Sequence, residues 1–432
     1  MPFSKLDKTI QDNIAQMGFT SATEIQKEAI PHALQGDDLL ASAKTGSGKT
    51  AAFLLPAIQR LIDTPRPDKM HPVVLILVPT RELSMQISAA AADMMKDLKP
   101  RCASIFGGQD YKTQLRILSK GCELLVATPG RLIDLMEQKK IFLSAVDLLI
   151  LDEADRMLDM GFSEAVAQIT KALPKKRQTL LFSATIGQKV RKFAQPLLNK
   201  PHEITVDTEV SQHSQITQSL IYADSLEHKK KLLAKVLEEN TDGPAIIFTA
   251  TKHQADSLAQ ELHEAGIKAG ALHGDMKQNK RTKTIARMQR GSLSTLVATD
   301  VAARGLDLPA LSLVVNFDIP MQAEDYVHRI GRTGRAGKTG DAVSLVTAKD
   351  LFLLKAIFSY TKQDIPVATI EGLEAKMDPK TAKSKAPNKR FGGRSRGPSH
   401  GPRSGFSNKK PAFGGKSKSK GPQKRRTFSK AR

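Results

Sequence analysis

Short apolar runs alternate with longer stretches of helical periodicity through most of the chain. Each run ends in a cluster of polar or small residues, and a helical pattern follows. Strands buried on both faces are almost continuously apolar, so this alternation predicts parallel β-sheets covered by helices. The expected strands are residues 73–78, 124–128, 146–151 and 179–183 in the first half, and 245–249, 269–272, 295–299, 313–317 and 342–346 in the second.

A polar segment without a long apolar run, residues 202–219, separates the two halves. We place a linker at 206–216, which predicts one domain at 1–205 and a second at 217–366. The expected fold class is therefore α/β, with two tandem parallel-sheet domains. Parallel sheets bind ligands at the carboxyl ends of their strands, so a cleft between the domains is the expected site.

Composition and charge narrow the class of protein. The chain has 432 residues, enough for two or three domains, and 66 Lys and Arg against 44 Asp and Glu give a net charge of +22. This charge favours a polyanionic partner, either nucleic acid or an anionic membrane. Two cysteines, Cys102 and Cys122, cannot build a disulfide framework or a four-ligand zinc site. Because no apolar run is long enough to span a membrane and the N-terminus lacks a signal-peptide core, we expect a soluble cytoplasmic protein.

Most of the excess charge lies in a C-terminal tail, predicted at 367–432. Residues 379–432 carry 18 Lys and Arg, no Asp or Glu, and no Leu, Ile or Val. A segment of this composition, rich in Gly, Ser and Pro, cannot offset chain entropy by burial, so we expect it to be disordered. Basic residues bind phosphates and aromatic rings stack on bases, which favours RNA contact over a merely solubilising role. The aromatic residues of the tail are Phe391, Phe406, Phe413 and Phe428.

A glycine-rich loop is the strongest local motif. Residues 43–50 read Ala-Lys-Thr-Gly-Ser-Gly-Lys-Thr, after the apolar stretch 39–41 and before a helical pattern. Glycines let backbone N–H groups approach phosphates, and Gly-Lys-Thr at the start of a helix fits a phosphate cradle. Lys49 would reach the β- and γ-phosphates of a nucleotide and Thr50 would hold Mg²⁺, although Ala43 stands where the general pattern has glycine.

An acidic cluster, Asp152-Glu153-Ala154-Asp155, follows the expected strand 146–151. Such a cluster is commonly only the acidic first turn of a helix. Downstream of a phosphate-binding loop in the same half of the chain, a role at a Mg²⁺–nucleotide site is favoured. Asp152 would hold Mg²⁺ through water, and Glu153 would position or deprotonate the attacking water.

Together with further motifs in a fixed order, these residues resemble the DEAD-box RNA helicases, and the resemblance covers about residues 1–365. It implies two RecA-like domains, ATP with Mg²⁺, and an RNA partner. The compact N-terminus resembles that of bacterial members. The further motifs are Gly18-Phe19 with Ile25-Gln26, Pro79-Thr80-Arg81-Glu82-Leu83, Gly107-Gly108, Thr128-Pro129-Gly130-Arg131, Ser183-Ala184-Thr185, Ile247-Phe248, Gln278 with Arg281, Ala302-Ala303-Arg304-Gly305-Leu306-Asp307 and His328-Arg329-Ile330-Gly331-Arg332-Thr333-Gly334-Arg335.

The resemblance implies an ATP site in which Gln26 reads the adenine edge, since an amide offers both a donor and an acceptor. Phe3 matches an aromatic that stacks on the base, with core packing as its alternative role, and Ala22 replaces the family's usual proline. The implied catalytic residues, including two arginines that contact the γ-phosphate, are Lys49, Asp152, Glu153, Arg332 and Arg335. The implied ATP-binding residues are Phe19, Thr23, Gln26, Ala43, Lys44, Thr45, Gly46, Ser47, Gly48, Lys49, Thr50 and Asp307.

The resemblance also implies an RNA-contacting set. Its glycines, hydroxyls and arginines suit backbone contact and none is built to read a base edge, so sequence-independent binding is expected. Contacts to the 2′-hydroxyl would favour RNA over DNA. The set is Pro79, Thr80, Arg81, Gly107, Gly108, Thr128, Pro129, Gly130, Arg131, Arg281 and Thr299, and the residues implied to couple the two sites are Asp155, Ser183, Thr185 and His328.

The expected function is an RNA-dependent ATPase that locally unwinds short RNA duplexes and remodels RNA or RNA–protein complexes by ATP-driven domain closure. A non-catalytic RNA chaperone is one alternative, and the intact Lys49, Glu153 and Arg335 argue against it. A DNA helicase of related fold is another, which Gln26 and the acidic box disfavour. The motifs do not name the RNA. Ribosomal precursors and RNA-turnover machinery are candidate partners, and no membrane partner is expected.

Overall fold

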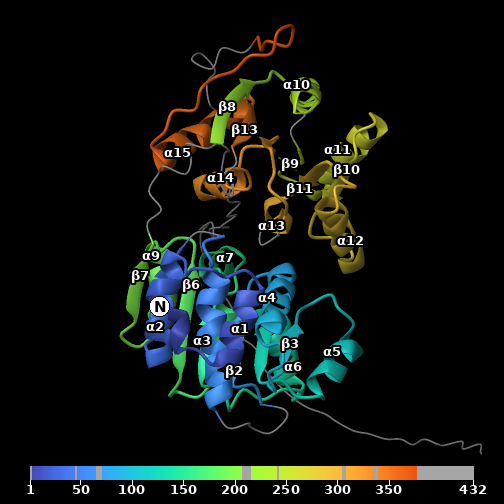
Figure 1. Ribbon diagram of the computed structural model, residues 1–432. Helices are drawn as coiled ribbons and strands as arrows, with labels where there is room; N and C mark the ends of the chain where they lie inside the picture. The colour runs from blue at the N-terminus through green and yellow to red at the C-terminus, as the bar shows by residue number, and fades with distance from the viewer. Residues whose placement is uncertain are drawn as a thin grey trace, which may run out of the picture. The chain divides into compact units, whose positions relative to one another are not determined.

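The computed structural model describes residues 2–43, 46–64, 71–206, 216–240, 243–303, 308–334 and 339–376. These residues form two parallel β-sheets: sheet A in a first lobe, drawn from residues 2–206, and sheet B in a second lobe, drawn from residues 216–376 (Figure 1). The expected fold class is confirmed. Every helix of the described residues falls short of the length and apolarity that a membrane span requires.

Sheet A has the strand order β3-β4-β2-β5-β6-β1-β7, and all neighbouring strands are parallel. Successive side chains of a strand point to opposite faces, so Leu39 and Ala41 join one hydrophobic cluster while Leu40 joins the other. The strands are β1 (Leu39–Ser42), β2 (Val74–Leu77), β3 (Cys102–Ile105), β4 (Leu124–Ala127), β5 (Leu148–Leu151), β6 (Gln178–Ser183) and β7 (His202–Thr205).

The helices of the first lobe cover the two faces of sheet A. One cluster contains residues of α1 (Lys8–Gln16), α2 (Glu24–Gln35), α3 (Lys49–Asp63) and α4 (Arg81–Met94), preceded by the 3₁₀ helix η1 (Pro2–Lys5). The other contains residues of α5 (Tyr111–Leu118), α6 (Pro129–Glu137), α7 (Ala154–Asp159), α8 (Ser163–Lys171) and α9 (Gln188–Ala194).

Sheet B repeats this construction in the order β10-β11-β9-β12-β13-β8, again all parallel. Its strands are β8 (Ile216–Tyr222), β9 (Ala245–Phe248), β10 (Ala269–Leu272), β11 (Thr295–Ala298), β12 (Leu313–Asn316) and β13 (Gly340–Val346). One face packs against α10 (Leu226–Glu239) and α11 (Lys252–Glu264). The other packs against α12 (Gln278–Gln289), α13 (Asp300–Ala303), α14 (Ala323–Ile330) and α15 (Leu351–Thr361), the last preceded by η3 (Ala348–Asp350).

The strands predicted from apolar runs are present, each within two residues of the expected limits. The apolar pattern missed β3, β7 and β8, which are edge strands of the two sheets. In β7 the one buried residue is Ile204, and β8 carries the polar run Thr217-Gln218-Ser219. An edge strand has fewer neighbours and needs no continuous apolar run, so its sequence is hard to distinguish from a loop.

The predicted linker at 206–216 is too long at both ends. The backbone N–H of Val206 donates to the carbonyl of Ser42 at 3.0 Å, which extends the pairing of β7 with β1, and Ile216 begins β8. Residues 207–215 of the predicted linker lie outside the described residues.

The predicted start of the disordered tail at residue 367 is also wrong. Leu220 of β8 donates its N–H to the carbonyl of Pro366 and accepts one from Ala368, both at 2.8 Å. Further along, Leu373 packs into the cluster that contains α10, and the N–H of Lys376 donates to Asp224 at 3.0 Å. Residues 365–376 therefore belong to the second lobe and cover the edge of sheet B. Residues 377–432 lie outside the described residues.

Candidate functional site

The order of strands in sheet A sorts the candidate motifs of the first lobe into two groups. The phosphate-binding loop, the acidic box and Ser183 lie at the carboxyl ends of β1, β5 and β6. The motifs at 79–81, 107–108 and 128–131 follow β2, β3 and β4. Because β3, β4 and β2 are neighbours, and β5, β6 and β1 are neighbours, each group occupies its own half of one sheet edge.

The phosphate-binding loop ends at Gly48, the N-cap of α3, which has a left-handed backbone (φ 94°). A Cβ there would lie 2.5 Å from Nε2 of Gln26, so both the backbone and the space require glycine. Nε2 of Gln26 donates to the carbonyl of Gly48 at 3.1 Å, and its Oε1 accepts the N–H of Thr23 at 3.0 Å. The buried Lys49 donates from Nζ to the carbonyl of Ala43 at 2.7 Å.

Phe3 and Phe19 lie edge to face, with ring centroids 6.4 Å apart. Both pack against the core cluster of α1–α4 and are partly buried. The contact ties η1 to the loop that precedes α2, so Phe3 has at least a packing role.

The acidic box follows β5 directly. Asp152 is almost fully buried, and the pKa of its carboxyl is raised to about 7: burial is the largest cause, the charges of Glu153 and Asp155 add to it, and the charge of Lys49 opposes it. Its Oδ1 accepts the N–H of Glu153 at 2.9 Å. Glu153 is the N-cap of α7 and has a left-handed backbone (φ 56°), which is uncommon for a residue with a side chain.

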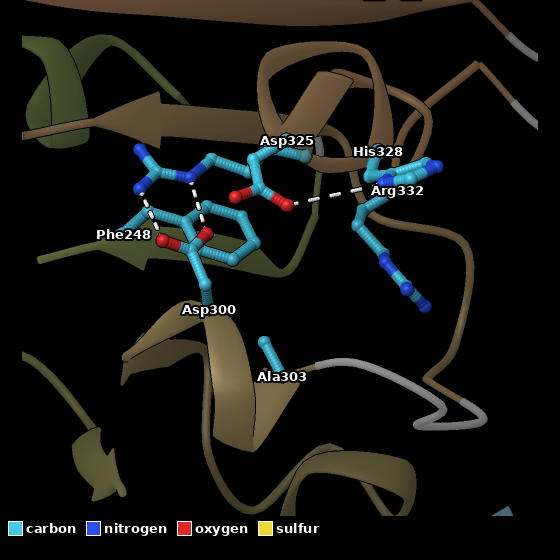
Figure 2. Close-up of a pocket in the computed structure, with 7 residues that line it drawn as sticks. Phe248, Asp300, Ala303, Asp325, His328 and Arg332 are labelled. Carbon is cyan, nitrogen blue, oxygen red and sulfur yellow. Dashed lines mark hydrogen bonds and ion pairs between the residues drawn. The ribbon is translucent and has the colours of Figure 1, made fainter. Parts of the chain in front are cut away.

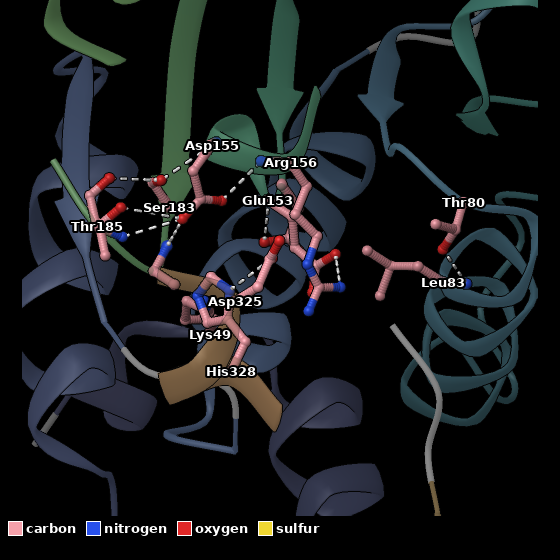
Figure 3. A network of polar contacts seen from close by, with 12 residues as sticks. Lys49, Thr80, Leu83, Glu153, Asp155, Arg156, Ser183, Thr185, Asp325 and His328 are labelled. Atoms are coloured by element: carbon pink, nitrogen blue, oxygen red, sulfur yellow. Dashed lines mark hydrogen bonds and ion pairs between the residues drawn. The ribbon is translucent and has the colours of Figure 1, made fainter. Parts of the chain in front are cut away.

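Asp155 joins the acidic box to the end of β6, as Figure 3 shows. Its Oδ2 accepts the N–H groups of Ala184 at 3.0 Å and Thr185 at 3.1 Å. The hydroxyl of Ser183 donates to the carbonyl of Thr185 at 2.8 Å and accepts the N–H of Asp155 at 3.3 Å. The implied coupling residues Asp155, Ser183 and Thr185 thus form one hydrogen-bonded unit.

The RNA candidates of the first lobe form a group rich in arginine. A Cβ at Gly108 (φ 81°) would collide with the guanidinium of Arg81, so the glycine leaves room for this side chain. Burial lowers the pKa of Arg81, and the nearby charge of Arg131 adds to the effect. Arg131 lies over the ring of Tyr111, 5.4 Å from its centroid.

The other RNA candidates of this lobe begin helices. Thr80 is the N-cap of α4, where its hydroxyl accepts the N–H of Leu83 at 3.3 Å, and Thr128 is the N-cap of α6. Pro79 lies between β2 and Thr80, and Pro129 and Gly130 form the start of α6. Helix N-termini present free N–H groups, which suits contact with phosphate.

In the second lobe, one RNA candidate on α12 reaches the end of β10 with its side chain, and another directly follows β11. Arg281 on α12 donates to the carbonyl of His273 at 3.2 Å and to that of Ala302 at 3.5 Å. Thr299 directly follows β11, and its N–H donates to the carbonyl of Leu272 at 3.2 Å.

The motif around α14 surrounds a small pocket lined by Phe248, Asp300, Ala303, Asp325, His328, Arg329 and Arg332 (Figure 2). Arg329 is its buried framework. The guanidinium contacts both carboxylate oxygens of Asp300, at 2.6 and 2.7 Å, and also Asn316 and the carbonyl of Asp318. His328 and Arg332, the residues named from the motif, line the same pocket. Four of the named site residues, Lys44, Thr45, Asp307 and Arg335, lie outside the described residues, as do the motif residues Arg304, Gly305 and Leu306.

Sequence reasoning gave no role to Arg329, which it included only as part of a motif, and it did not name Asp300 or Arg156. Nη1 of Arg156 lies 2.6 Å from Oε2 of Glu153, and both side chains are buried. The spacing of three residues on one helix was the available signal, because residues i and i+3 are neighbours on a helix surface.

Comparison with known families and proteins matches most of the chain. Residues 23–193 match the family described as DEAD/DEAH box helicase, and residues 228–337 match the helicase conserved C-terminal domain. Over 373 residues the chain is 44% identical to the ATP-dependent RNA helicase SrmB of Escherichia coli, covering 86% of this chain and 84% of SrmB. It is 42% identical over 359 residues to the DEAD-box ATP-dependent RNA helicase CshA of Bacillus cereus, covering 83% of this chain and 67% of CshA.

Solved structures of proteins bound to RNA and a nucleotide analogue resemble this chain in fold. Dbp5 of S. cerevisiae bound to RNA and ADP BeF3 has a TM-score of 0.75 and 31% identity, covering 85% of this chain and 95% of that one. The DEAD-box helicase Mss116 bound to ssRNA and UDP-BeF has a TM-score of 0.76 and 33% identity, covering 85% of this chain and 78% of that one.

Proposed function

The chain belongs to the DEAD-box ATP-dependent RNA helicases, and on this basis we propose that it separates short RNA duplexes locally by an ATP-driven closure of its two lobes. As a member of this family it is an ATP-hydrolysing RNA helicase whose partner is RNA. The proposal adds the roles of individual residues, the metal ion and the way in which hydrolysis is coupled to strand separation.

One observation carries the proposal: sheet A holds the nucleotide motifs and the RNA motifs of the first lobe on adjoining halves of the same edge. Within the nucleotide half, the unit of Asp155, Ser183 and Thr185 bonds the acidic box after β5 to the end of β6, and β5 is the strand that borders the RNA half. A rigid sheet with this arrangement supports mechanical coupling of the two sites without long-range motion inside the lobe.

In the nucleotide site, Lys49 binds the β- and γ-phosphates and Glu153 activates the attacking water. The Gln26 amide forms one hydrogen bond with Gly48 and one with Thr23, which leaves one amide N–H and one lone pair of Oε1 unused. Gln26 reads adenine with this remaining donor and acceptor. Arg332, with Arg335 and Asp307 from outside the described residues, completes the site from the second lobe, and His328 links it to RNA.

Thr50 and Asp152 are the residues that would hold Mg²⁺, the second through water. The fit is supported by Asp152 itself, a buried carboxyl whose pKa is raised by burial and by two neighbouring carboxylates. A divalent cation relieves such a concentration of negative charge, as expected for a Mg²⁺–nucleotide site. When bound, Mg²⁺ neutralises charge on the phosphates.

The RNA-contacting residues named from the motifs bind the sugar–phosphate backbone of one strand. Arg81, Arg131 and Gly108 form their centre in the first lobe, where the glycine keeps the arginine side chain close to the backbone. We further propose the predicted division into domains 1–205 and 217–366, with residue 206 added to the first domain and residues 216 and 367–376 added to the second. We also propose that the basic tail adds RNA affinity.

The test is RNA-stimulated ATP hydrolysis together with displacement of a short RNA duplex, using the full chain. Glu153→Gln should abolish turnover while nucleotide binding persists, because the change removes a base and retains the size of the side chain. Glu164→Gln is the matched control, since this exposed glutamate lies on α8 of the same lobe, and it should keep normal activity.

The outcomes separate the alternatives. ATP-independent displacement would point to an RNA chaperone, and equal stimulation by DNA and RNA single strands would point to a DNA helicase. Normal turnover by Glu153→Gln would remove Glu153 from its role.

A further inference from the structure

Glu153 is held at both ends. Its backbone N–H donates to Oδ1 of Asp152 at 2.9 Å, which fixes the left-handed N-cap conformation. Its carboxylate lies 2.6 Å from Nη1 of Arg156, one turn later on α7 (Figure 3). The direction of the Glu153 carboxylate therefore depends on the side chain of Arg156, the residue that follows the acidic box.

We propose that Arg156 is a positioning residue for ATP hydrolysis, which orients the Glu153 carboxylate toward the attacking water. This inference rests on the proposed role of Glu153 as the water-activating base.

The contacts of Arg156 distinguish it from a framework arginine. Arg329 is equally buried, and its guanidinium joins Asp300, Asn316 and Asp318, which lie on or beside different elements. Within the described part of the chain, the guanidinium of Arg156 has one acceptor, Glu153. Arg156 thus connects no second element by hydrogen bonds, and its placement serves the one carboxylate it touches.

Stability does not explain the pair. The side chains of Arg156 and Glu153 are 5% and 9% exposed, so both charges have lost most of their water. Taking two charges out of water offsets most of their attraction, and a buried pair is weak support for a folded state. The pair instead fixes the direction of the Glu153 carboxylate. This matters for catalysis because a displacement of about 1 Å between reacting groups can lower the rate strongly.

The neighbouring acid does not depend on this side chain. Arg156 also contacts Asp155, but through its backbone N–H, which donates to Oδ1 at 3.0 Å. Every substitution of Arg156 other than proline keeps that N–H, so the unit of Asp155, Ser183 and Thr185 stays intact. A variant of Arg156 therefore changes the orientation of Glu153 without removing the link to β6.

The experiment measures kcat, the KM for ATP and the RNA concentration for half-activation in the full chain. Arg156→Met, close in size and uncharged, should lower kcat by about 10- to 100-fold, the cost expected of a misplaced catalytic group. The KM for ATP and the half-activating RNA concentration should stay within about twofold, since phosphate, base and RNA contacts lie elsewhere. Arg156→Lys keeps a charge that can reach the carboxylate and should recover most of kcat.

Two further variants keep the result interpretable. Arg60→Met is the matched control, because Arg60 contacts Gln178 at 2.6 Å and Asp147 at 3.6 Å in the same lobe, away from the acidic box; it should leave kcat unchanged. The double variant Glu153→Gln/Arg156→Met removes both charges together, so it tests for misfolding caused by an unpaired buried carboxylate. In single-turnover measurements at high enzyme concentration, which resolve slow residual hydrolysis below the limit of a turnover assay, it should be no slower than Glu153→Gln alone.

The failures are distinguishable. Normal hydrolysis by Glu153→Gln would remove the proposed function on which the inference rests. Loss of hydrolysis in Glu153→Gln with normal or raised kcat in Arg156→Met would leave that function intact and overturn the positioning role. A parallel loss in Arg156→Met and Arg156→Lys accompanied by a large rise in KM, or a further loss in the double variant, would also overturn it.

Discussion

The raised pKa of Asp152 predicts that binding of a magnesium–nucleotide complex releases a proton from this carboxyl. Burial, with the charges of the neighbouring acids, raises the pKa to about 7 from an ordinary value of 3.8, so we expect the carboxyl of the free protein to be mostly protonated below pH 7. A carboxyl must be ionised to take part in a Mg²⁺ site, directly or through water. Binding at or below neutral pH is therefore coupled to loss of that proton.

The size of the effect follows from the pKa. With a value near 7, the free protein carries about 0.9 proton on this group at pH 6, about 0.5 at pH 7 and about 0.1 at pH 8, and binding should release those amounts. The affinity for magnesium–nucleotide should fall about tenfold for each pH unit below 7 and become independent of pH well above it.

Titration calorimetry in two buffers of different ionisation enthalpy measures the protons released. Saturating Mg²⁺ keeps the nucleotide itself deprotonated. Asp152→Asn should bind more weakly and release no proton from this position, whereas Asp147→Asn, which changes a half-buried carboxyl beside Arg60 in the same lobe, should behave as the parent does. Equal proton release by the parent and Asp152→Asn at pH 6 would refute the reasoning.

Three further predictions follow from the same site. Lys49→Ala should weaken ATP binding at least tenfold in a fluorescent-nucleotide titration, because the variant lacks the buried ammonium that binds phosphate; unchanged affinity would contradict this. Gln26→Ala should reduce discrimination of ATP from GTP, since an amide left unpaired by guanine costs about 1–3 kcal/mol; equal use of both nucleotides by the parent in a turnover assay would exclude this role. Deletion of 379–432 should raise the half-activating RNA concentration and reduce the log–log salt slope by about 0.7 for each RNA phosphate that the tail neutralises, with maximal turnover unchanged. If the full-length and the truncated protein gave the same half-activating RNA concentration at both of two salt concentrations, the tail would not bind RNA.

The inner strands were predictable because both of their faces are covered. Residues 74–77, 124–127 and 148–151 are buried throughout, and burial on both faces demands an unbroken apolar run. The edge strands β3, β7 and β8 have a neighbouring strand on one side only and do not need an unbroken apolar run. The sequence therefore predicted the inner strands and the edge strand β10, but missed the other three edge strands and misplaced the linker ends and the segment at 367–376.

The motifs indicated the candidate site residues, but the contacts that these residues make required the structure. Spacing along the chain cannot show that Gln26 bonds to the carbonyl of Gly48, 22 positions away, or that Asp155 accepts N–H groups from residues beyond β6. The first contact depends on the packing of α2 beside the start of α3, and the second on the strand order, which makes β5 and β6 neighbours. Arg156 was missed because a charged residue on a short helix is normally solvated, so its spacing of three residues from Glu153 does not by itself indicate a buried pair.

The candidate ATP contacts are already occupied by the protein itself. Lys49 donates to the carbonyl of Ala43, Gln26 donates to that of Gly48, and Glu153 is paired with Arg156. In the proposed site, nucleotide binding at Lys49 would exchange one hydrogen bond for another, and an exchanged bond contributes less net free energy than a bond added to an unpaired group. When no nucleotide is bound, the hydrogen bond to Ala43 avoids the cost of leaving the buried ammonium of Lys49 unpaired. Such a site favours modest affinity for nucleotide, so release after each cycle does not require strong contacts to be broken without replacement.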